Sequence, residues 1–305
     1  MNCGLIIPTL NAGAQFQTLL EQISAQTLPL KKLIVDSEST DATVALAEKF
    51  GFEVLTVPRE KFNHGATRQF ALEKILPVDV AIFLTQDVLL FDGSTLAKLV
   101  EIFARDSSVG LAYGRQLPRS DATFEAKILR EFNYPAVSQL RDLSWRKKLG
   151  LKAAMASNSF AAYRVSTLQA VGGFPAVILC EDMYVAAKML LAGFKTFYAA
   201  DAQVFHSHNY TAAQEFRRYF DIGAFHAREN WIRANFGSAE GAGGNFLRLK
   251  YSALLRENPA EIFGALFRDA AKFFGYRFGR LAEFLPREVV ESCTANRNFW
   301  RRDFY

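Results

Sequence analysis

The sequence predicts an α/β protein: a mostly parallel, Rossmann-like sheet with helices on both faces, followed by a C-terminal helical extension. In the first two thirds of the chain, short apolar β-type runs alternate with helical patterns, as in a parallel sheet with crossover helices. Polar residues follow four successive predicted strands, at the edge where open α/β sheets bind ligands. From residue 212 onward the pattern is helical. We therefore predict two regions, residues 1–211 and 212–305.

Apolar runs and helical spacing define the individual elements. Strands are expected at residues 4–7, 32–35, 53–57, 80–84, 109–114, 157–164 and 195–205, and helices at residues 15–26, 41–50, 66–76, 93–105 and 180–195. Residues 133–151 are polar and poorly periodic, so a loop is expected there.

The last long helix is predicted over residues 258–285. Asn258 suits its N-cap and Pro259 its first turn. Phe263, Phe267 and Phe274 share one face, which also carries Phe278 and Leu281 and runs beside a stripe of small residues. We expect this helix to pack on residues 1–211, with contact to a membrane surface as the alternative.

Composition bounds the class of protein. At 305 residues, with 50% hydrophobic and 22% charged residues, the chain can bury one large core. Cys3, Cys180 and Cys293 share no metal-binding spacing and suit a reducing compartment. No secretory signal and no stretch of roughly 20 apolar residues is recognisable. A cytoplasmic location is therefore expected.

The positive charge is unevenly distributed. Residues 212–305 hold 15 lysines and arginines against 11 acidic residues, whereas residues 1–211 hold 21 against 20. With its aromatic ending "RNFWRRDFY", which includes Arg297, Trp300, Arg301, Arg302 and Phe304, this region could contact an anionic membrane surface. A solvated basic face is the alternative. We expect no nucleic-acid partner.

Polar side chains at the first two strand ends suit a nucleotide. The first strand runs into Pro8, Thr9 and Asn11, and the second into "VDSESTDAT". Asp36, Ser37 and Ser39 of this second motif could accept a hydrogen bond from a base or bind a ribose. Ser39 or Thr40, before Asp41, could instead cap a helix.

Asp87 interrupts the apolar run "VAIFLTQDVLLF", with Gln86 beside it. A buried carboxylate requires a cation or hydrogen-bond donors, and hard divalent cations such as Mg²⁺ prefer oxygen ligands. His206 and His208 are two residues apart in an extended segment, on one side of it, and one of them could complete a Mg²⁺ or Mn²⁺ site.

Two further motifs carry groups suited to chemistry. Glu181 and Asp182 begin a predicted helix, where acidic residues are favoured by the dipole but could also act as a general base toward a hydroxyl. "KFNHGATRQF" places Asn63, His64, Gly65 and Arg68 between a strand and a helix, a group that could bind an anion. A dinucleotide GxGxxG motif and a P-loop are both missing from the sequence.

These motifs in this order resemble the family 2 glycosyltransferases with the GT-A nucleotide-diphospho-sugar fold. "IIPTLNAG", "VDSESTDAT", "TQDV", "NSFAAYRVSTLQAVGGFP" and "EDMYVAAKMLLAGF" carry the resemblance, over about residues 4–211. "FNHGATR" and "HSHNY" are similar to the dTDP-rhamnosyltransferase subgroup.

The resemblance implies a role for each candidate residue. Pro8, Thr9, Asn11, Asp36, Ser37, Ser39 and Gln86 would hold the nucleoside, and Asn63, His64, Gly65 and Arg68 would lie near the donor sugar and diphosphate. Asp87 and His206 would bind Mg²⁺ or Mn²⁺, although the family's DXD motif reads Thr85-Gln86-Asp87 here. Asp182, or alternatively Glu181, would be the base, and residues 133–151 would lie on the acceptor side.

The implied activity is inverting transfer of L-rhamnose from dTDP-β-L-rhamnose to a growing cell-surface polysaccharide or lipid-linked glycan. It would take place in the cytoplasm, at the inner face of the plasma membrane if the C-terminal region contacts lipid. A UDP-hexose donor, or a non-catalytic nucleotide- or glycan-binding module, are the alternatives.

Overall fold

The computed structural model describes residues 1–237 and 240–301, with the side chains of 240–242 left aside. The strands are β1 (Cys3–Thr9), β2 (Leu30–Asp36), β3 (Glu53–Thr56), β4 (Val80–Leu84), β5 (Leu89–Leu90), β6 (Val109–Leu117), β7 (Gln139–Arg141), β8 (Phe160–Arg164) and β9 (Lys195–Phe205). The α-helices are α1 (Gln15–Ser24), α2 (Thr43–Lys49), α3 (His64–Ile75), α4 (Thr95–Arg105), α5 (Phe124–Asn133), α6 (Arg146–Leu149), α7 (Val165–Ala170), α8 (Glu181–Leu191), α9 (Ala212–Arg228), α10 (Asn230–Phe236), α11 (Glu240–Glu257), α12 (Ile262–Gly279), α13 (Arg287–Cys293) and α14 (Arg297–Arg301). Short 3-10 helices are η1 (Arg59–Lys61), η2 (Leu143–Trp145), η3 (Gly150–Ala154), η4 (Pro259–Glu261) and η5 (Ala282–Phe284).

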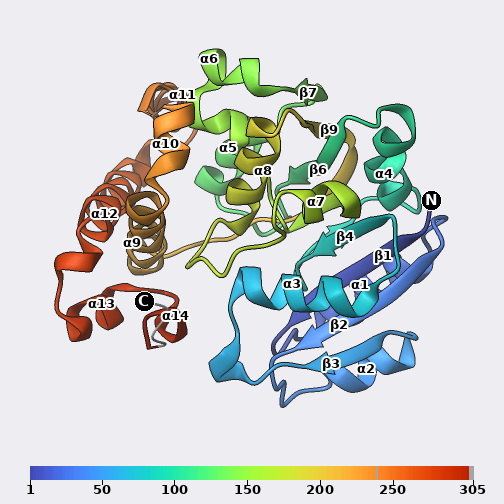
Figure 1. Ribbon diagram of the computed structural model, residues 1–305. Coiled ribbons are helices and arrows are strands. Elements are labelled where there is room, and N and C mark those ends of the chain that lie inside the picture. Colours follow the sequence, from blue (N-terminus) through green and yellow to red (C-terminus); the bar gives the residue numbers. More distant parts are fainter. Residues whose placement is uncertain (238–239, 302–305) are drawn as a thin grey trace.

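One twisted sheet runs through the α/β part in the order β3-β2-β1-β4-β8-β6-β9-β5, with β7 paired to β9 (Figure 1). The expected parallel arrangement holds for β3, β2, β1 and β4. From β8 onward the sheet is mixed, because β8 runs antiparallel to both β4 and β6. This reversal brings the residues just before β8 beside the end of β4.

The apolar strands separate two cores. Along β4, Val80, Ile82 and Leu84 face a core formed with α1, α2 and α4, whereas Ala81 and Phe83 face a second core with α3, α7 and α8. The alternation follows from the two-residue period of a strand, and burial on both faces explains why these strands have few polar residues. Helices cover both faces, as the sequence predicted.

The C-terminal helices extend the second core. α9 starts after Thr211, whose side chain and Gln214 form a capping box. Phe220, Phe225 and Trp300 belong to the same buried cluster as Phe83 of the sheet. The helices gather on one side of the sheet in Figure 1. Residues 212–305 thus complete the core of residues 1–211 within the described part of the chain.

Two expectations differ from the structure. The region 133–151 is not a plain loop, because β7 pairs with β9 and short helices follow it. The aromatic end of the chain folds back: Trp300 is buried, and Arg301 Nε lies 3.2 Å from Glu291 Oε2. The predicted membrane contact through this end is therefore wrong for Trp300, while Arg302 and Phe304 lie outside the described residues.

Candidate active site

The ends of β1 and β2 are joined by one carboxylate. Asp36 is buried, and its Oδ1 accepts hydrogen bonds from Thr9 Oγ1 at 2.8 Å and Ser39 Oγ at 2.6 Å. Its Oδ2 accepts from the Ser39 amide at 2.8 Å. The buried Ser37 hydroxyl has no hydrogen-bond partner in the described part of the chain. A buried polar group of this kind usually gains its partner from a ligand or water.

Asn11 and Gln86 complete the same edge of the sheet. Asn11 Oδ1 accepts from the Thr40 amide at 2.8 Å, and the Gln86 side chain bonds both the amide and the carbonyl of Leu10, at 2.7 and 3.0 Å. Pro8 lies one residue before the end of β1. The structure therefore places the seven residues predicted to bind the nucleotide at the ends of β1, β2 and β4, and Gln86 links the end of β4 to the end of β1.

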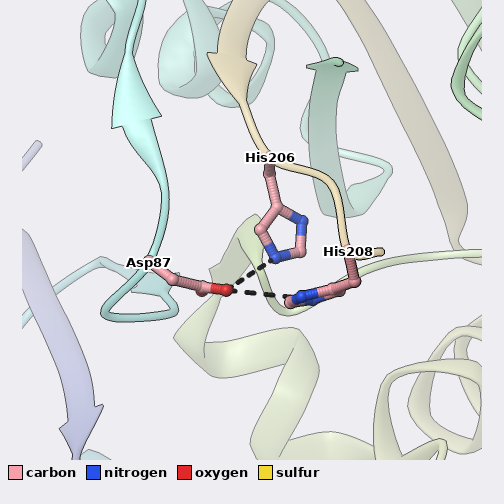
Figure 2. Close-up of side chains that lie close together, drawn as sticks. All are labelled: Asp87, His206 and His208. Carbon is pink, nitrogen blue, oxygen red and sulfur yellow. Dashed lines mark ion pairs between the residues drawn. The ribbon is translucent and has the colours of Figure 1, made fainter. Parts of the chain in front are cut away.

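A cluster of one carboxylate and two imidazoles lies where β4 and β9 end. Asp87 Oδ2 is 3.3 Å from His206 Nε2 and 3.8 Å from His208 Nε2, and Figure 2 shows the carboxylate facing both rings. One ligand atom from each residue lies within 4.8 Å of the others. The set fits Mg²⁺ or Mn²⁺, and His208 joins the predicted pair of Asp87 and His206.

Hydrogen bonding behind His206 favours a cation at this cluster. Gln116 Oε1 accepts from Arg130 Nη1 at 2.6 Å and lies 2.9 Å from His206 Nδ1. Because this oxygen is only an acceptor, His206 must donate from Nδ1. Burial also lowers the pKa of His206, although Asp87 opposes the shift. The neutral ring then presents a lone pair at Nε2 on the side of the Asp87 carboxylate, so His206 and Asp87 are suited to hold a cation.

The adjacent carboxylates Glu181 and Asp182 have different environments at the start of α8. Glu181 Oε1 lies 2.8 Å from Arg68 Nη1 and accepts from Asn158 Nδ2 at 2.9 Å, with both members of the ion pair buried. Asp182 accepts only backbone hydrogen bonds among the described residues, from Asn158 at 3.1 Å and Met183 at 2.8 Å. Glu181 is held by a cation, and Asp182 is not.

The pKa values of the two carboxyls move in opposite directions. Burial alone would raise the pKa of Glu181, but the Arg68 guanidinium, His64 and the hydrogen bond from Asn158 together outweigh burial and lower the pKa. Burial, together with the negative charge of Glu181, raises the pKa of Asp182 to about 6. A carboxylate with a pKa near neutrality is suited to general-base catalysis. The geometry therefore distinguishes two residues that are equivalent in the sequence.

Three consecutive residues before β8 connect the two groups of side chains. Ser157 Oγ accepts from Gln116, which in turn orients His206. Asn158 binds both Asp182 and Glu181, and the Ser159 carbonyl accepts from the Thr85 amide at 3.3 Å, two residues before Asp87. The histidine cluster and the carboxylate pair are thus linked through this one segment.

The residues of the "FNHGATR" motif mainly hold the site in place. Asn63 caps α3 through the Ala66 amide at 2.9 Å and binds the Val177 carbonyl at 2.8 Å. A Cβ on Gly65 would lie 1.8 Å from the Pro175 carbonyl oxygen, so the chain before α8 crosses this helix start closely. These contacts give Asn63 and Gly65 structural roles, and the predicted place of this motif near the donor sugar and diphosphate stays a prediction. Burial lowers the pKa of His64 to about 4, although Glu181 opposes the shift.

Backbone strain and unpredicted residues both occur here. Within the described residues, the non-glycine positions with positive φ are Asn11, Glu38 and Cys180, at the ends of β1 and β2 and directly before α8. Such conformations cost free energy and cluster at functional sites.

Sequence reasoning missed Gln116 because it ended the predicted strand at residue 114. It also missed Asn158, which it placed inside a strand.

The chain matches a known protein family. Residues 5–172 match the sequence profile of glycosyl transferase family 2. The chain belongs to this family. Over its whole length, this family 2 glycosyltransferase is 42% identical to the O-antigen chain rhamnosyltransferase RfbN of Salmonella typhimurium, of which it covers 98%. It is 40% identical, over 99% of its length, to the O-antigen chain rhamnosyltransferase WbaN of Salmonella anatum, of which it covers 96%.

A solved structure shares the fold. The mannosyltransferase PcManGT from Pyrobaculum calidifontis, in complex with GDP-Man and Mn²⁺, matches with a TM-score of 0.63 at 17% identity, covering 92% of this chain and 87% of that one. The family 2 glycosyltransferase therefore has the GT-A fold that its motifs resemble.

Proposed function

We propose that this enzyme is an inverting rhamnosyltransferase. It would transfer L-rhamnose from dTDP-β-L-rhamnose to a hydroxyl of a growing cell-surface polysaccharide or lipid-linked glycan, at the cytoplasmic face of the plasma membrane. Two whole-length relatives named as O-antigen chain rhamnosyltransferases support the sugar and the class of acceptor. The observation that carries the mechanism is the unpaired carboxylate of Asp182 beside the Arg68–Glu181 ion pair.

In this proposal, Asp182 accepts the proton of the acceptor hydroxyl. The oxygen forms a bond to the anomeric carbon while the bond from that carbon to the diphosphate oxygen breaks, and dTDP leaves with the electron pair. Attack from the side opposite the diphosphate inverts the configuration and gives an α-L-rhamnoside. Burial and the negative charge of Glu181 both oppose ionisation of Asp182 and so raise the pKa of this base.

The edge formed by β2, β1 and β4 would bind the nucleoside. The unpartnered hydroxyl of Ser37 and the carboxylate of Asp36 are polar groups available to a base or ribose at this edge. Asp87, His206 and His208 would hold Mg²⁺ or Mn²⁺. When bound, the ion would neutralise charge on the departing diphosphate. Gln116 and Arg130 orient His206 for this role.

A nucleotide-sugar panel tests the donor. Ligands that bind only the folded protein raise its melting temperature, so dTDP and dTDP-rhamnose should give a larger shift with Mn²⁺ than UDP, GDP or their sugars. Transfer to a glycan acceptor, with the anomeric configuration of the product read by NMR, tests the reaction. Turnover of a UDP-hexose in place of dTDP-rhamnose would contradict the donor assignment. Binding of dTDP without turnover on any acceptor would instead indicate a binding module.

A further inference from the structure

Helix α12 is attached to α9 through its small residues. A Cβ on Gly279 would lie 1.9 Å from the Phe220 carbonyl oxygen, and one on Gly275 would lie 2.4 Å from the Phe216 carbonyl oxygen. Gly223 of α9 approaches α12 in the same way, because a Cβ on Gly223 would lie 2.3 Å from the Tyr276 carbonyl oxygen. The two backbones are therefore in direct contact at these glycines.

Several aromatic side chains of α12 point away from the protein, whereas Tyr276 and Phe278 contact α9. Phe263, Phe267 and Phe274 are 83%, 70% and 62% exposed, contrary to the expectation that their face packs on residues 1–211. Other large apolar side chains are exposed on α12 and directly after it: Leu266, Phe273, Leu281 and Phe284. We call these seven residues the aromatic face. Contiguous exposed apolar surface of this kind usually marks a binding surface.

A groove of about 600 Å³ adjoins the aromatic face, between α12 and the helices α9 and α10. Its apolar lining is Phe216, Phe274, Phe278 and Leu281, and its charged lining is Arg233, Arg277 and Arg280. Tyr276 completes it, and no carboxylate lines it within the described part of the chain.

The three groove arginines have no ion-pair partner among the described residues. By contrast, Arg268 and Lys272 on the opposite side of α12 bind Glu125 and Glu215. Arg280 Nε is buried without a hydrogen-bond partner. Unpaired guanidinium groups next to exposed aromatic rings are complementary to phosphate above an apolar layer.

We propose that the aromatic face and the groove bind the surface of an anionic phospholipid bilayer. The arginines would contact lipid phosphates, while the phenylalanine rings would enter the boundary between headgroups and acyl chains. No helix in the part of the chain described is both long and apolar enough to cross a bilayer. The purpose of this contact, access to a lipid-linked acceptor, rests on the proposed function, whereas the contact itself does not.

Charge argues against a second copy of the chain as the occupant. A two-fold dimer places the same patch on both sides of its interface. The groove would then bring arginines of one protomer toward arginines of the other, without carboxylates in its lining to pair them. An anionic bilayer supplies the opposite charge directly.

Flotation of the full-length protein with vesicles tests the proposal, without any nucleotide sugar present. Wild type should bind vesicles of phosphatidylglycerol and phosphatidylcholine at low salt, bind phosphatidylcholine alone much more weakly, and be released at high salt. Phe267→Ser with Phe274→Ser should lower the partition coefficient at least about tenfold, since each ring loses apolar burial. Arg277→Glu changes the charge by two units, so at about 1 kcal/mol for each unit of charge near the surface it should lower the partition coefficient about 30-fold.

Two control variants make the same kinds of substitution at exposed residues outside the aromatic face and the groove. Phe91→Ser removes a ring that is 51% exposed elsewhere, and Lys49→Glu reverses an exposed charge on α2. Both should bind vesicles like wild type. Equal binding by all variants, or no binding of wild type at low salt, would overturn the proposal. So would a dimer that Phe267→Ser with Phe274→Ser dissociates while vesicle binding is unchanged. None of these outcomes depends on the donor sugar, so the proposed function is tested separately.

Discussion

Arg68 and Glu181 form a buried ion pair, with Nη1 2.8 Å from Oε1, although the two residues come from helices far apart in the sequence. Glu181→Gln would leave the Arg68 charge buried without a partner. We expect a loss of about 3 to 5 kcal/mol in the free energy of unfolding, measured by denaturant titration. Glu73→Gln, at an exposed residue that bonds only Gln69, serves as the control and should change stability by less than about 0.5 kcal/mol.

Asp182→Asn should remove the general base while keeping the fold. The rate of sugar transfer should fall by a factor of about 10² to 10⁴. Nucleotide binding should change little, because Asp182 lies outside the strand edge proposed to bind the nucleoside. The melting temperature should fall slightly, because the asparagine amide can replace only one of the two carboxylate oxygens that accept backbone N–H groups. Activity close to wild type in this variant would reassign the role to Glu181.

The raised pKa of Asp182 predicts a pH profile. The base works only when it is ionised, so kcat/KM should rise with pH through about 6 and then level off. Glu181 raises this pKa through its negative charge, and the Arg68 charge lowers it. The midpoint should therefore move to lower pH in Glu181→Gln. An unchanged midpoint in that variant would show that the profile reports another group.

Gln116 should control metal affinity without being a ligand. Gln116→Met removes the acceptor that orients His206 Nδ1. Loss of such an outer partner typically weakens metal binding about 10- to 100-fold. Calorimetric titration with Mn²⁺ measures this affinity. Gln203→Met is the control, because Gln203 lies on β9, just before His206, but its side chain donates to the Ala200 carbonyl and not to a histidine. Asp87→Ala should abolish the metal-dependent part of nucleotide binding.

Two glycines of α12 should respond oppositely to the same substitution. Gly279→Ala places a Cβ 1.9 Å from the Phe220 carbonyl and should destabilise the protein by about 1 to 3 kcal/mol or more. A Cβ on Gly264 would meet only the flexible end of Arg268, at 3.3 Å. Gly264→Ala should therefore be neutral or stabilise by up to about 1 kcal/mol, because alanine favours the helix. Thermal and denaturant unfolding of both variants distinguishes them.

The sequence was sufficient for the longer strands and for the polar edge of the sheet, because apolar periodicity and polar residues at strand ends are local signals, but it missed the short strands β5 and β7. Reasoning from the residues alone left Asp182 and Glu181 open as the base, and only the family resemblance ranked Asp182 first, because Arg68, which binds Glu181, lies on another helix. Nor could it orient α12. Helical spacing identifies an apolar face, but the close approach of α9 to Gly275 and Gly279 decided which side was buried.

Gly65 shows how a position can be restricted by a neighbouring carbonyl rather than by a ligand. Because the Pro175 oxygen occupies the space of any side chain at residue 65, natural variation there should be as restricted as at Asp182. Sequence variation among homologues would then be equally low at residues 65 and 182. Low variation at Gly65 alone would not show that this glycine contacts the nucleotide-sugar donor. Restricted variation at residue 65 would follow from the segment before α8, which lies directly on the start of α3.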